Sequence, residues 1–291
     1  KTGIKSKYPT VVLLSGAGSD SIDWQSVQPD LAAITEVISL DRSGVLNSDI
    51  SSESQDQQQI AKDLFLVLQA YEIKEVILVG HSLANLTLLN FYALFENEID
   101  IKGMVSVDGM ALNPANMEIL KAMSGPANLM ADFMLFLFQI GLGKVVNTSQ
   151  KWRDYPEDFR NRVDQHYLDA MLPYRKLSTH AVTLVREGGN MYVNAVEATS
   201  IELPTRFPVY VLHSTIDDEN VEGSNEYKYF PDIREHLIRD VTEKKQWHRA
   251  YAENSLNGRY IETKEHGHFI HGENSGLVIQ TIREILEVSV A

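Results

Sequence analysis

The chain of 291 residues contains no cysteine. This absence excludes disulfides, thiolate metal ligands and cysteine nucleophiles together. It does not fix the compartment, because chains without cysteine occur on both sides of a membrane. The chain begins at Lys1 and not at methionine, so we expect a processed or trimmed N-terminus. Both a cytoplasmic and a secreted or cell-surface location therefore stay open.

Basic charge is scarce. Lysine and arginine together number 26 against 40 aspartates and glutamates, which gives a formal net charge of -14. The most basic stretch, TEKKQWHR (242–249), is short and mixed. Nucleic-acid binding requires a basic face, so we exclude a nucleic-acid partner and expect a small-molecule one. The sequence leaves the oligomeric state open.

Long hydrophobic runs are also missing. The longest, FMLFLFQIGLG (133–143), is too short to span a bilayer and predicts part of a buried helix or a pocket wall. Hydrophobic residues nevertheless make up 44% of the chain and charged residues 23%. That composition is typical of a globular protein, and the length suffices for one large domain with an insertion.

The first part of the chain alternates short apolar runs with amphipathic stretches. The apolar runs are typical of buried strands, and the stretches between them have helical spacing. Such alternation predicts an α/β fold with a mostly parallel sheet and helices on both faces. The expected strands lie at 9–19, 35–44, 75–80 and 101–109, and the expected helices at 23–34, 58–71 and 83–95.

The alternation lapses after the fourth of these strands. Residues 112–200 are rich in methionine, phenylalanine and helical pattern, and we expect the 117–138 stripe to form cap core with some residues facing the substrate. Strand pattern returns at 207–214 and 258–267, before a last helix at 276–288. We therefore predict a core built from 1–111 and 201–291, with a helical cap at 112–200.

The stretch VILVGHSLANL (76–86) places Ser82 in a turn between an expected strand and an expected helix. Gly80 and Ala84, two positions to either side, allow a close approach of strand and helix. Such a turn raises the serine hydroxyl above the sheet, and the amide of Leu83 points at the same place. This arrangement predicts a nucleophile, although a serine capping a helix would show the same local pattern.

A serine nucleophile needs a histidine base and a carboxylate that orients it. His266, His268 and His271 follow the last expected strand. The carboxylate candidates end two different strands: Asp217 and Asp218 follow the strand at 207–214, and Asp108 ends the strand at 101–109.

Taken together and in order, these motifs resemble the α/β-hydrolase superfamily, in its lidded lipase- and esterase-like branch. The resemblance covers nearly the whole chain outside the cap. It implies Ser82 as nucleophile, Asp217 as acid, His268 as base, and the amides of Ala17 and Leu83 as oxyanion donors. Ser15, Ala84 and Ser214 depart from the residues common at their positions. The motifs are SGAGS (15–19), LDRSG (40–44), GHSLA (80–84), LHSTID (212–217) and GHFIHGEN (267–274).

The resemblance implies a serine hydrolase that cleaves a carboxylic ester of a small, partly hydrophobic substrate through an acyl-enzyme, without a cofactor. A serine at the elbow disfavours the relatives that open epoxides through an aspartate. A lactonase, a hydrolase of carbon–carbon bonds and a non-catalytic binding or receptor protein remain alternatives on the same scaffold.

Five further residues are expected near the substrate: Arg42, His81, Met110, Phe133 and Phe269. Arg42 has a second interpretation as half of a structural ion pair, and His81 as a packing residue. The histidines of the 264–274 segment, together with Glu273, also have the composition of a metal site. The resemblance accounts for His268 without a metal, so we predict none.

Overall fold

A computed structural model describes residues 1–139, 155–176, 178–215, 221, 228 and 230–290. Within these residues the sheet has seven strands in the order β1-β3-β2-β4-β5-β6-β7. Strands β2 to β7 run parallel, and β1 pairs antiparallel with β3 at the edge. The strands are β1 (Thr2–Gly3), β2 (Thr10–Leu14), β3 (Glu36–Leu40), β4 (Glu75–His81), β5 (Asp100–Val107), β6 (Val209–Ser214) and β7 (Arg259–Thr263).

Both faces of the sheet are covered by helices, so its strands are apolar on both sides. Val11 and Leu13 of β2 belong to one buried cluster, which includes residues of α1 (Gln28–Ala32) and α11 (Ser275–Ser289). Val12 and Leu14 alternate with them and belong to the cluster on the other face. Burying each such side chain contributes about 1.5–3 kcal/mol, which explains the continuous apolar runs in the sequence.

The second face is covered by α2 (Gln57–Ala70), α3 (Ala84–Phe95) and the C-terminal part of α9 (Arg234–Glu253). Helix α2 shows why these segments are helical. Asp56 caps its first turn by accepting from the amide of Gln59 at 2.7 Å. The residues Ile60, Leu64 and Leu68 then recur every four positions and are all buried against the sheet.

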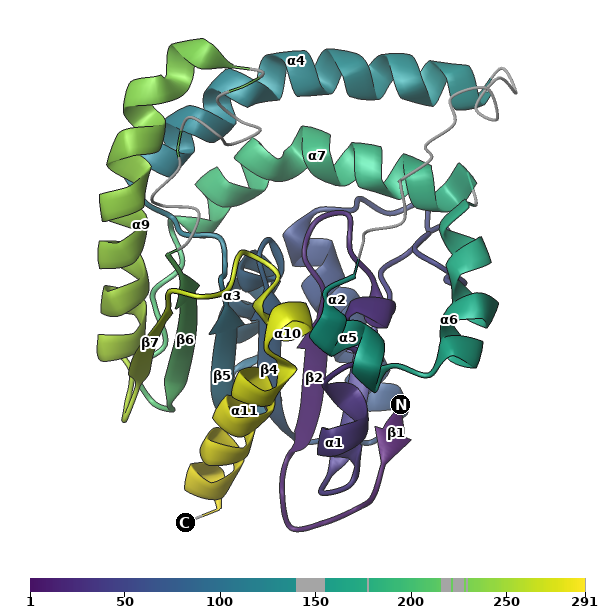
Figure 1. The fold of residues 1–291 in the computed structure, drawn as a ribbon, viewed down its shortest axis with the longest axis vertical. Coiled ribbons are helices and arrows are strands. Elements are labelled where there is room, and N and C mark those ends of the chain that lie inside the picture. The colour runs from purple at the N-terminus through teal and green to yellow at the C-terminus, as the bar shows by residue number, and fades with distance from the viewer. Residues whose placement is uncertain (140–154, 177, 216–220, 222–227, 229, 291) are drawn as a thin grey trace.

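Every regular element described between β5 and β6 is helical, as expected for a helical insertion after the fourth predicted strand. In Figure 1, α4 crosses the top of the molecule and α7 runs beneath it, between α4 and the sheet. Helix α9 rises at the side of the sheet toward α4 and has no counterpart among the predicted elements. The helices of the insertion are α4 (Pro114–Gln139), α5 (Glu157–Arg162), α6 (Gln165–Met171) and α7 (Ser178–Ala198), with the 3₁₀ helix η3 (Leu172–Lys176).

The run at 133–143 differs in part from its prediction. Phe133 and Phe136 are 59% and 52% exposed, so this part of α4 does not bury them as a core helix would. Residues 140–143 lie outside the described part of the chain. None of the helices that the structure describes has both the length and the apolarity needed to cross a bilayer.

The fold brings the carboxyl ends of the parallel strands to one edge, the edge that faces α7 (Figure 1). In open α/β sheets, ligands bind in the crevice outside these strand ends. The loops that follow β2, β4, β5 and β7 all emerge there.

Candidate active site

Ser82 lies in a strained turn between β4 and α3. Its φ is 55°, in the left-handed region that residues with a Cβ rarely adopt. The turn is held on both sides, because the Ser82 amide donates to Val107 O at 3.2 Å and the Met110 amide donates to Ser82 O at 2.9 Å. Gly16 packs directly against this turn, and only a glycine fits there, because a Cβ on residue 16 would lie 2.7 Å from the Ser82 Cβ. The hydroxyl is thereby presented at the end of the sheet.

His268 meets this hydroxyl from the loop after β7. Its Nε2 lies 2.9 Å from Ser82 Oγ, and its Nδ1 lies 2.6 Å from Asp108 Oδ2. Since a carboxylate accepts, Nδ1–H donates to Asp108, and Nε2 is left to accept from the serine hydroxyl. The imidazole is half-exposed, with 50% of its side chain accessible. The three side chains form one hydrogen-bonded row.

Asp108 ends β5 and is almost completely buried, with 2% of its surface exposed. Its second oxygen, Oδ1, accepts from the Ser214 amide at 3.1 Å and lies 3.3 Å from Lys244 Nζ. Burial by itself would raise the pKa of Asp108, but the charge of Lys244 and the hydrogen bond from His268 outweigh it. They hold the pKa well below its usual range. Asp108 is therefore ionised.

Among the described residues, the carboxylate that contacts His268 is Asp108, the alternative candidate from the sequence. Asp217 and its neighbour Asp218 lie outside the described residues, and Asp108 already accepts the hydrogen bond from His268 Nδ1. Asp108 is therefore the described carboxylate that is placed to orient His268, and Asp217 stays a prediction. The signal in the sequence was the placement of an aspartate directly at the end of a buried strand, before Gly109.

His81 is a packing residue that also supports the base. Its Nε2 lies 2.9 Å from the carbonyl oxygen of His268, which accepts the hydrogen bond. The two rings lie 4.6 Å apart between centroids. His81 is 3% exposed and precedes Ser82 directly. It therefore fixes the backbone of the histidine loop relative to the elbow.

The two amides expected to bind an oxyanion belong to Ala17, after β2, and Leu83, at the start of α3. In the described part of the chain, neither amide donates a hydrogen bond to another backbone group. Leu83 is the N-cap residue of α3, where the helix dipole favours negative charge. Ala17 lines the same cavity as Ser82.

Arg42, expected near the substrate, instead braces the loop that carries Ala17. Its guanidinium donates to three carbonyls of that loop: Ser15 O at 2.7 Å, Ser19 O at 2.9 Å and Gly16 O at 3.2 Å. Arg42 also forms an ion pair with Glu187 of α7. The two side chains are 9% and 1% exposed, so the pair is buried between the core and the insertion. The interpretation of Arg42 as half of an ion pair is the one that the structure supports.

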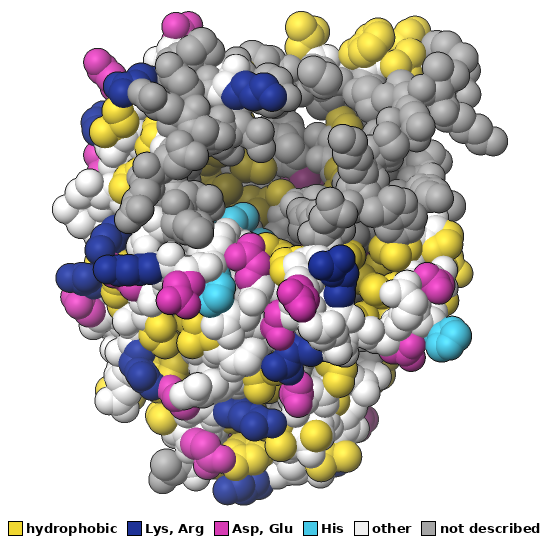
Figure 2. Space-filling model, viewed as in Figure 1, with side chains coloured by type: hydrophobic (Ala, Val, Ile, Leu, Met, Phe, Trp, Pro, Cys, Tyr) yellow, Lys and Arg dark blue, Asp and Glu magenta, His cyan; other side chains and the backbone are white. Residues whose placement is uncertain are grey.

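A cavity of about 300 Å³ opens at Ser82. Figure 2 shows a hollow on this face below the helical insertion, with apolar side chains in its floor and a histidine at its edge. Phe133 is not among the lining residues, and Met110 packs instead in an apolar cluster with Leu83 and residues of α7. The lining residues are Ala17, Ser19, His81, Ser82, Tyr155, Pro156, His268, Phe269 and Glu273.

The other residues of the 264–274 segment are engaged separately. His266 bonds Asn274 at 2.9 Å, His271 stacks on Trp24 with ring centroids 4.4 Å apart, and Glu273 accepts from the Gly267 amide at 2.7 Å. They do not converge on one point as metal ligands would.

A different group has metal-like spacing. Among the described residues, Asp108, His213 and His248 bring one ligand atom each within 4.8 Å of one another. The Nδ1 atoms of the two histidines lie 2.7 Å apart, which is a hydrogen bond and not the span across a shared ion. Asp108 accepts from His268 at the same time. We assign His213 and His248 as a hydrogen-bonded pair that packs beside Asp108.

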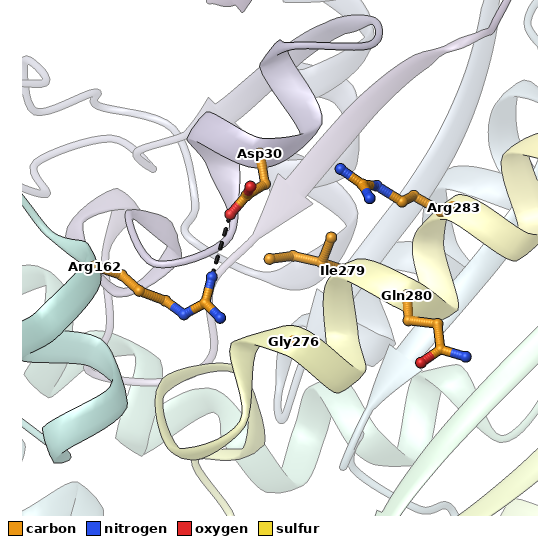
Figure 3. Close-up of a pocket in the computed structure, with 6 residues that line it drawn as sticks. All are labelled: Asp30, Arg162, Gly276, Ile279, Gln280 and Arg283. Atoms are coloured by element: carbon orange, nitrogen blue, oxygen red, sulfur yellow. Dashed lines mark hydrogen bonds and ion pairs between the residues drawn. The ribbon is translucent and has the colours of Figure 1, made fainter.

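A second cavity, of about 360 Å³, lies between α1, α5 and α11 (Figure 3). It is lined by Asp30, Arg162, Gly276, Ile279, Gln280 and Arg283. Asp30 and Arg162 point toward each other across it, with the nearest atoms 3.3 Å apart (Figure 3). Its lining residues include no serine and no histidine, so the site at Ser82 is the candidate active site.

Comparison with known proteins agrees with this geometry. The sequence model of the alpha/beta hydrolase family matches residues 11–281. No curated protein matches the chain significantly in sequence.

Solved structures share the fold at low sequence identity. A thermophilic esterase from Thermogutta terrifontis is 16% identical with a TM-score of 0.63, over 100% of this chain and 92% of that chain. Est816, described as an enzyme that degrades N-acyl homoserine lactones, is 15% identical with a TM-score of 0.59, over 96% and 94%. The epoxide hydrolase CorEH is 16% identical with a TM-score of 0.59, over 98% and 93%.

Proposed function

The chain belongs to the alpha/beta hydrolase family, and from this premise we propose that it is a serine hydrolase. Its reaction is the cleavage of a carboxylic ester of a small, partly hydrophobic substrate through an acyl-enzyme. The observation that carries the proposal is the hydrogen-bonded row of Ser82, His268 and Asp108, with distances of 2.9 Å and 2.6 Å. This is the arrangement that activates a serine hydroxyl as a nucleophile.

In the first step, Ser82 Oγ attacks the ester carbonyl while His268 Nε2 takes its proton. The buried Asp108 carboxylate stabilises the imidazolium that forms and keeps the ring in the correct tautomer. The carbonyl oxygen becomes an oxyanion and accepts from the amides of Ala17 and Leu83. His268 then protonates the departing alcohol, and Ser82 is left acylated.

In the second step, water replaces the alcohol. His268 removes a proton from the water as it attacks the acyl carbon, and the same two amides hold the second oxyanion. Collapse of this intermediate releases the carboxylic acid and returns the proton to Ser82. The residues named complete the cycle with water as the only further reactant.

The cavity indicates a neutral substrate with an apolar portion. Tyr155 and Phe269 place aromatic surface in its wall, and their ring centroids lie 6.3 Å apart. Glu273 adds negative charge to the same wall, which disfavours anionic acyl groups. We infer that the insertion, residues 112–200, is the lid of this cavity, because Tyr155 and Pro156 contribute to the lining.

A lactone is the second candidate substrate, since it is a cyclic ester and the same steps open it. The structural similarity to the lactone-degrading Est816 favours including it. The two candidates share the triad and differ only in the shape of substrate that the lid admits.

The test is hydrolysis of a panel of short and medium chromogenic esters, neutral and anionic, and of acyl lactones. Wild type is compared with Ser82→Ala. We expect turnover of neutral esters or lactones by wild type and a loss of at least about 10³-fold in the variant. A wild type as inert as Ser82→Ala on every substrate would overturn the proposal in favour of a binding protein.

A further inference from the structure

The triad acid has a cation on the side away from the histidine. Asp108 Oδ2 accepts from His268, while Asp108 Oδ1 lies 3.3 Å from Lys244 Nζ. Lys244 is one of the residues of α9, a helix outside the predicted elements. Its side chain is 21% exposed, so the ammonium reaches into the protein toward a carboxylate that is 2% exposed. Among the described residues, no other lysine or arginine lies within 4.0 Å of Asp108.

His248, one of the two histidines beside Asp108, does not supply this charge. Burial lowers the pKa of His248 to about 3, so His248 is neutral above that pH. Its Nε2–H donates to Gly109 O at 2.7 Å, which leaves Nδ1 as an acceptor. His213 therefore donates its Nδ1 proton to His248, at 2.7 Å, and not to Asp108 Oδ1, which is 3.7 Å away.

We propose that Lys244 is a positioning residue of the active site, which holds Asp108 in place and sets the pH at which His268 begins to act as a base. This inference rests on the proposed function and extends the row by one member, to Ser82–His268–Asp108–Lys244. Lys244 acts on the reaction through Asp108, which is what makes it a positioning residue.

The direction of the effect follows from charge. A positive ammonium beside the His268–Asp108 pair opposes the binding of a further proton by that pair, whichever member receives it. Removing the ammonium makes protonation easier, so the inactive, protonated form persists to higher pH. The titratable groups beside Asp108 in the described structure are His268 after β7, His213 on β6 and His248 on α9. On α9, Asp240 lies one turn before Lys244, and Glu262 of β7 pairs with the neighbouring Lys245.

The experiment compares Lys244→Gln and Lys244→Arg with a matched control. Lys245→Gln removes the same charge one residue further along α9, where the lysine pairs with Glu262 and not with Asp108. For Lys244→Gln we expect the acid limb of the kcat/KM profile to move up by about one pH unit, with a lower kcat and little change in KM. Lys244→Arg is expected to restore the wild-type limb, and Lys245→Gln to leave it in place.

A second measurement does not depend on turnover. Nuclear magnetic resonance of the imidazole of His268 follows its titration directly, and the midpoint is expected to rise in Lys244→Gln alone. If no ester or lactone is hydrolysed but this midpoint still shifts, the proposed function fails and the role of Lys244 stands. Identical midpoints and acid limbs in wild type, Lys244→Gln and Lys245→Gln would overturn the inference, as would equal shifts in both glutamine variants.

Discussion

Two residues in the site carry a left-handed backbone although each has a side chain. The φ of Ser82 is 55° and that of Asp108 is 41°. Such a conformation costs of order 1–2 kcal/mol per residue and persists only where the surroundings enforce it. Here the Ser82 amide donates to Val107 O, and the Asp108 amide donates to Leu212 O at 2.8 Å. The sheet thus holds Ser82 and Asp108 in strained conformations that direct both side chains to His268.

The identity of the acid gives the first prediction. Asp108→Asn removes the negative charge and the acceptor that hold His268 in its tautomer, so kcat/KM is expected to fall about 10³–10⁴-fold. Asp217→Asn is expected to stay within about threefold of wild type. Steady-state ester hydrolysis by both variants, with melting temperatures to show that each is folded, decides the point. A large loss in Asp217→Asn with an active Asp108→Asn would return the role to Asp217.

Gly16 gives the second prediction. Gly16→Ala would put a Cβ 2.7 Å from the Ser82 Cβ and 3.1 Å from His81 Nδ1, so the loop that carries Ala17 must move away from the elbow. We expect kcat to fall at least about tenfold, because a shift of one ångström misplaces the oxyanion donor. Gly188→Ala in α7, where an added Cβ meets nothing within 4 Å, is the control and is expected to keep its activity. Equal activity in both variants would contradict the argument.

Some residues of the candidate site could be predicted individually from the sequence, and others could not. Ser82 and His268 follow from local pattern, because each sits in a motif at the end of one strand. The acid does not, because β5 and β6 are adjacent and parallel, so both strands end at the same edge of the sheet. Asp108 and Asp217 satisfy the same spacing rule, so sequence order cannot choose between them, and the structure adds the contact of Asp108 with His268.

At the scale of elements, a buried ion pair connects α7 to the loops that follow strands β2 and β3. Glu187 of α7 pairs with Arg42, and Arg42 donates to three carbonyls of the Ala17 loop. The amide of Gly18 also lies 3.5 Å from Glu187 Oε2. The position of α7 and the shape of the loop that carries Ala17 are therefore coupled through one buried pair.

This coupling gives the third prediction. Glu187→Gln leaves the buried guanidinium of Arg42 without its counter-charge, which typically costs about 3–5 kcal/mol of stability. We expect a lower melting temperature and a kcat reduced about tenfold, with KM less affected. Differential scanning calorimetry and ester kinetics measure the two effects. Glu197→Gln, an exposed change on the same helix, is the control. A Glu187→Gln protein as stable and active as this control would refute the coupling.

The elements themselves were predicted unevenly. The parallel strands and the helices between them followed from apolar periodicity, since both faces of the sheet are buried. The edge strand β1 has only two residues and both are exposed, so it leaves no periodic signal. Helix α9 is rich in charged residues and buries mainly its C-terminal part, where His248, Tyr251 and Ala252 lie. Because its exposed residues are mostly charged, the sequence showed this segment only as a short basic stretch and not as a helix.

At the scale of the whole molecule, the buried histidine His248 links folding to pH. In the unfolded chain His248 has its ordinary pKa near 6.5, while burial lowers it to about 3 in the folded protein. The unfolded state therefore binds more protons between these values. Stability from this group is complete above about pH 6.5 and is lost as pH falls toward the folded value.

The fourth prediction follows from that sign. Between pH 7 and pH 5, this histidine alone is expected to lower the free energy of unfolding by about 2 kcal/mol. His248→Gln is expected to be less stable at pH 7 but to lose correspondingly less on acidification. Urea titrations at both pH values measure the difference, and His166→Gln, at an exposed position, is the control. An equal loss on acidification in wild type and His248→Gln would rule out this linkage.

The central claim, a serine activated at the edge of the sheet, has one direct measurement. The protein is treated with a fluorophosphonate at neutral pH and then analysed by intact mass and peptide mapping. We predict a single adduct on Ser82, formed rapidly in wild type, slowly in Asp108→Asn and not at all in Ser82→Ala. An unlabelled Ser82 in folded wild-type protein, or equal labelling of wild type and Asp108→Asn, would contradict the account.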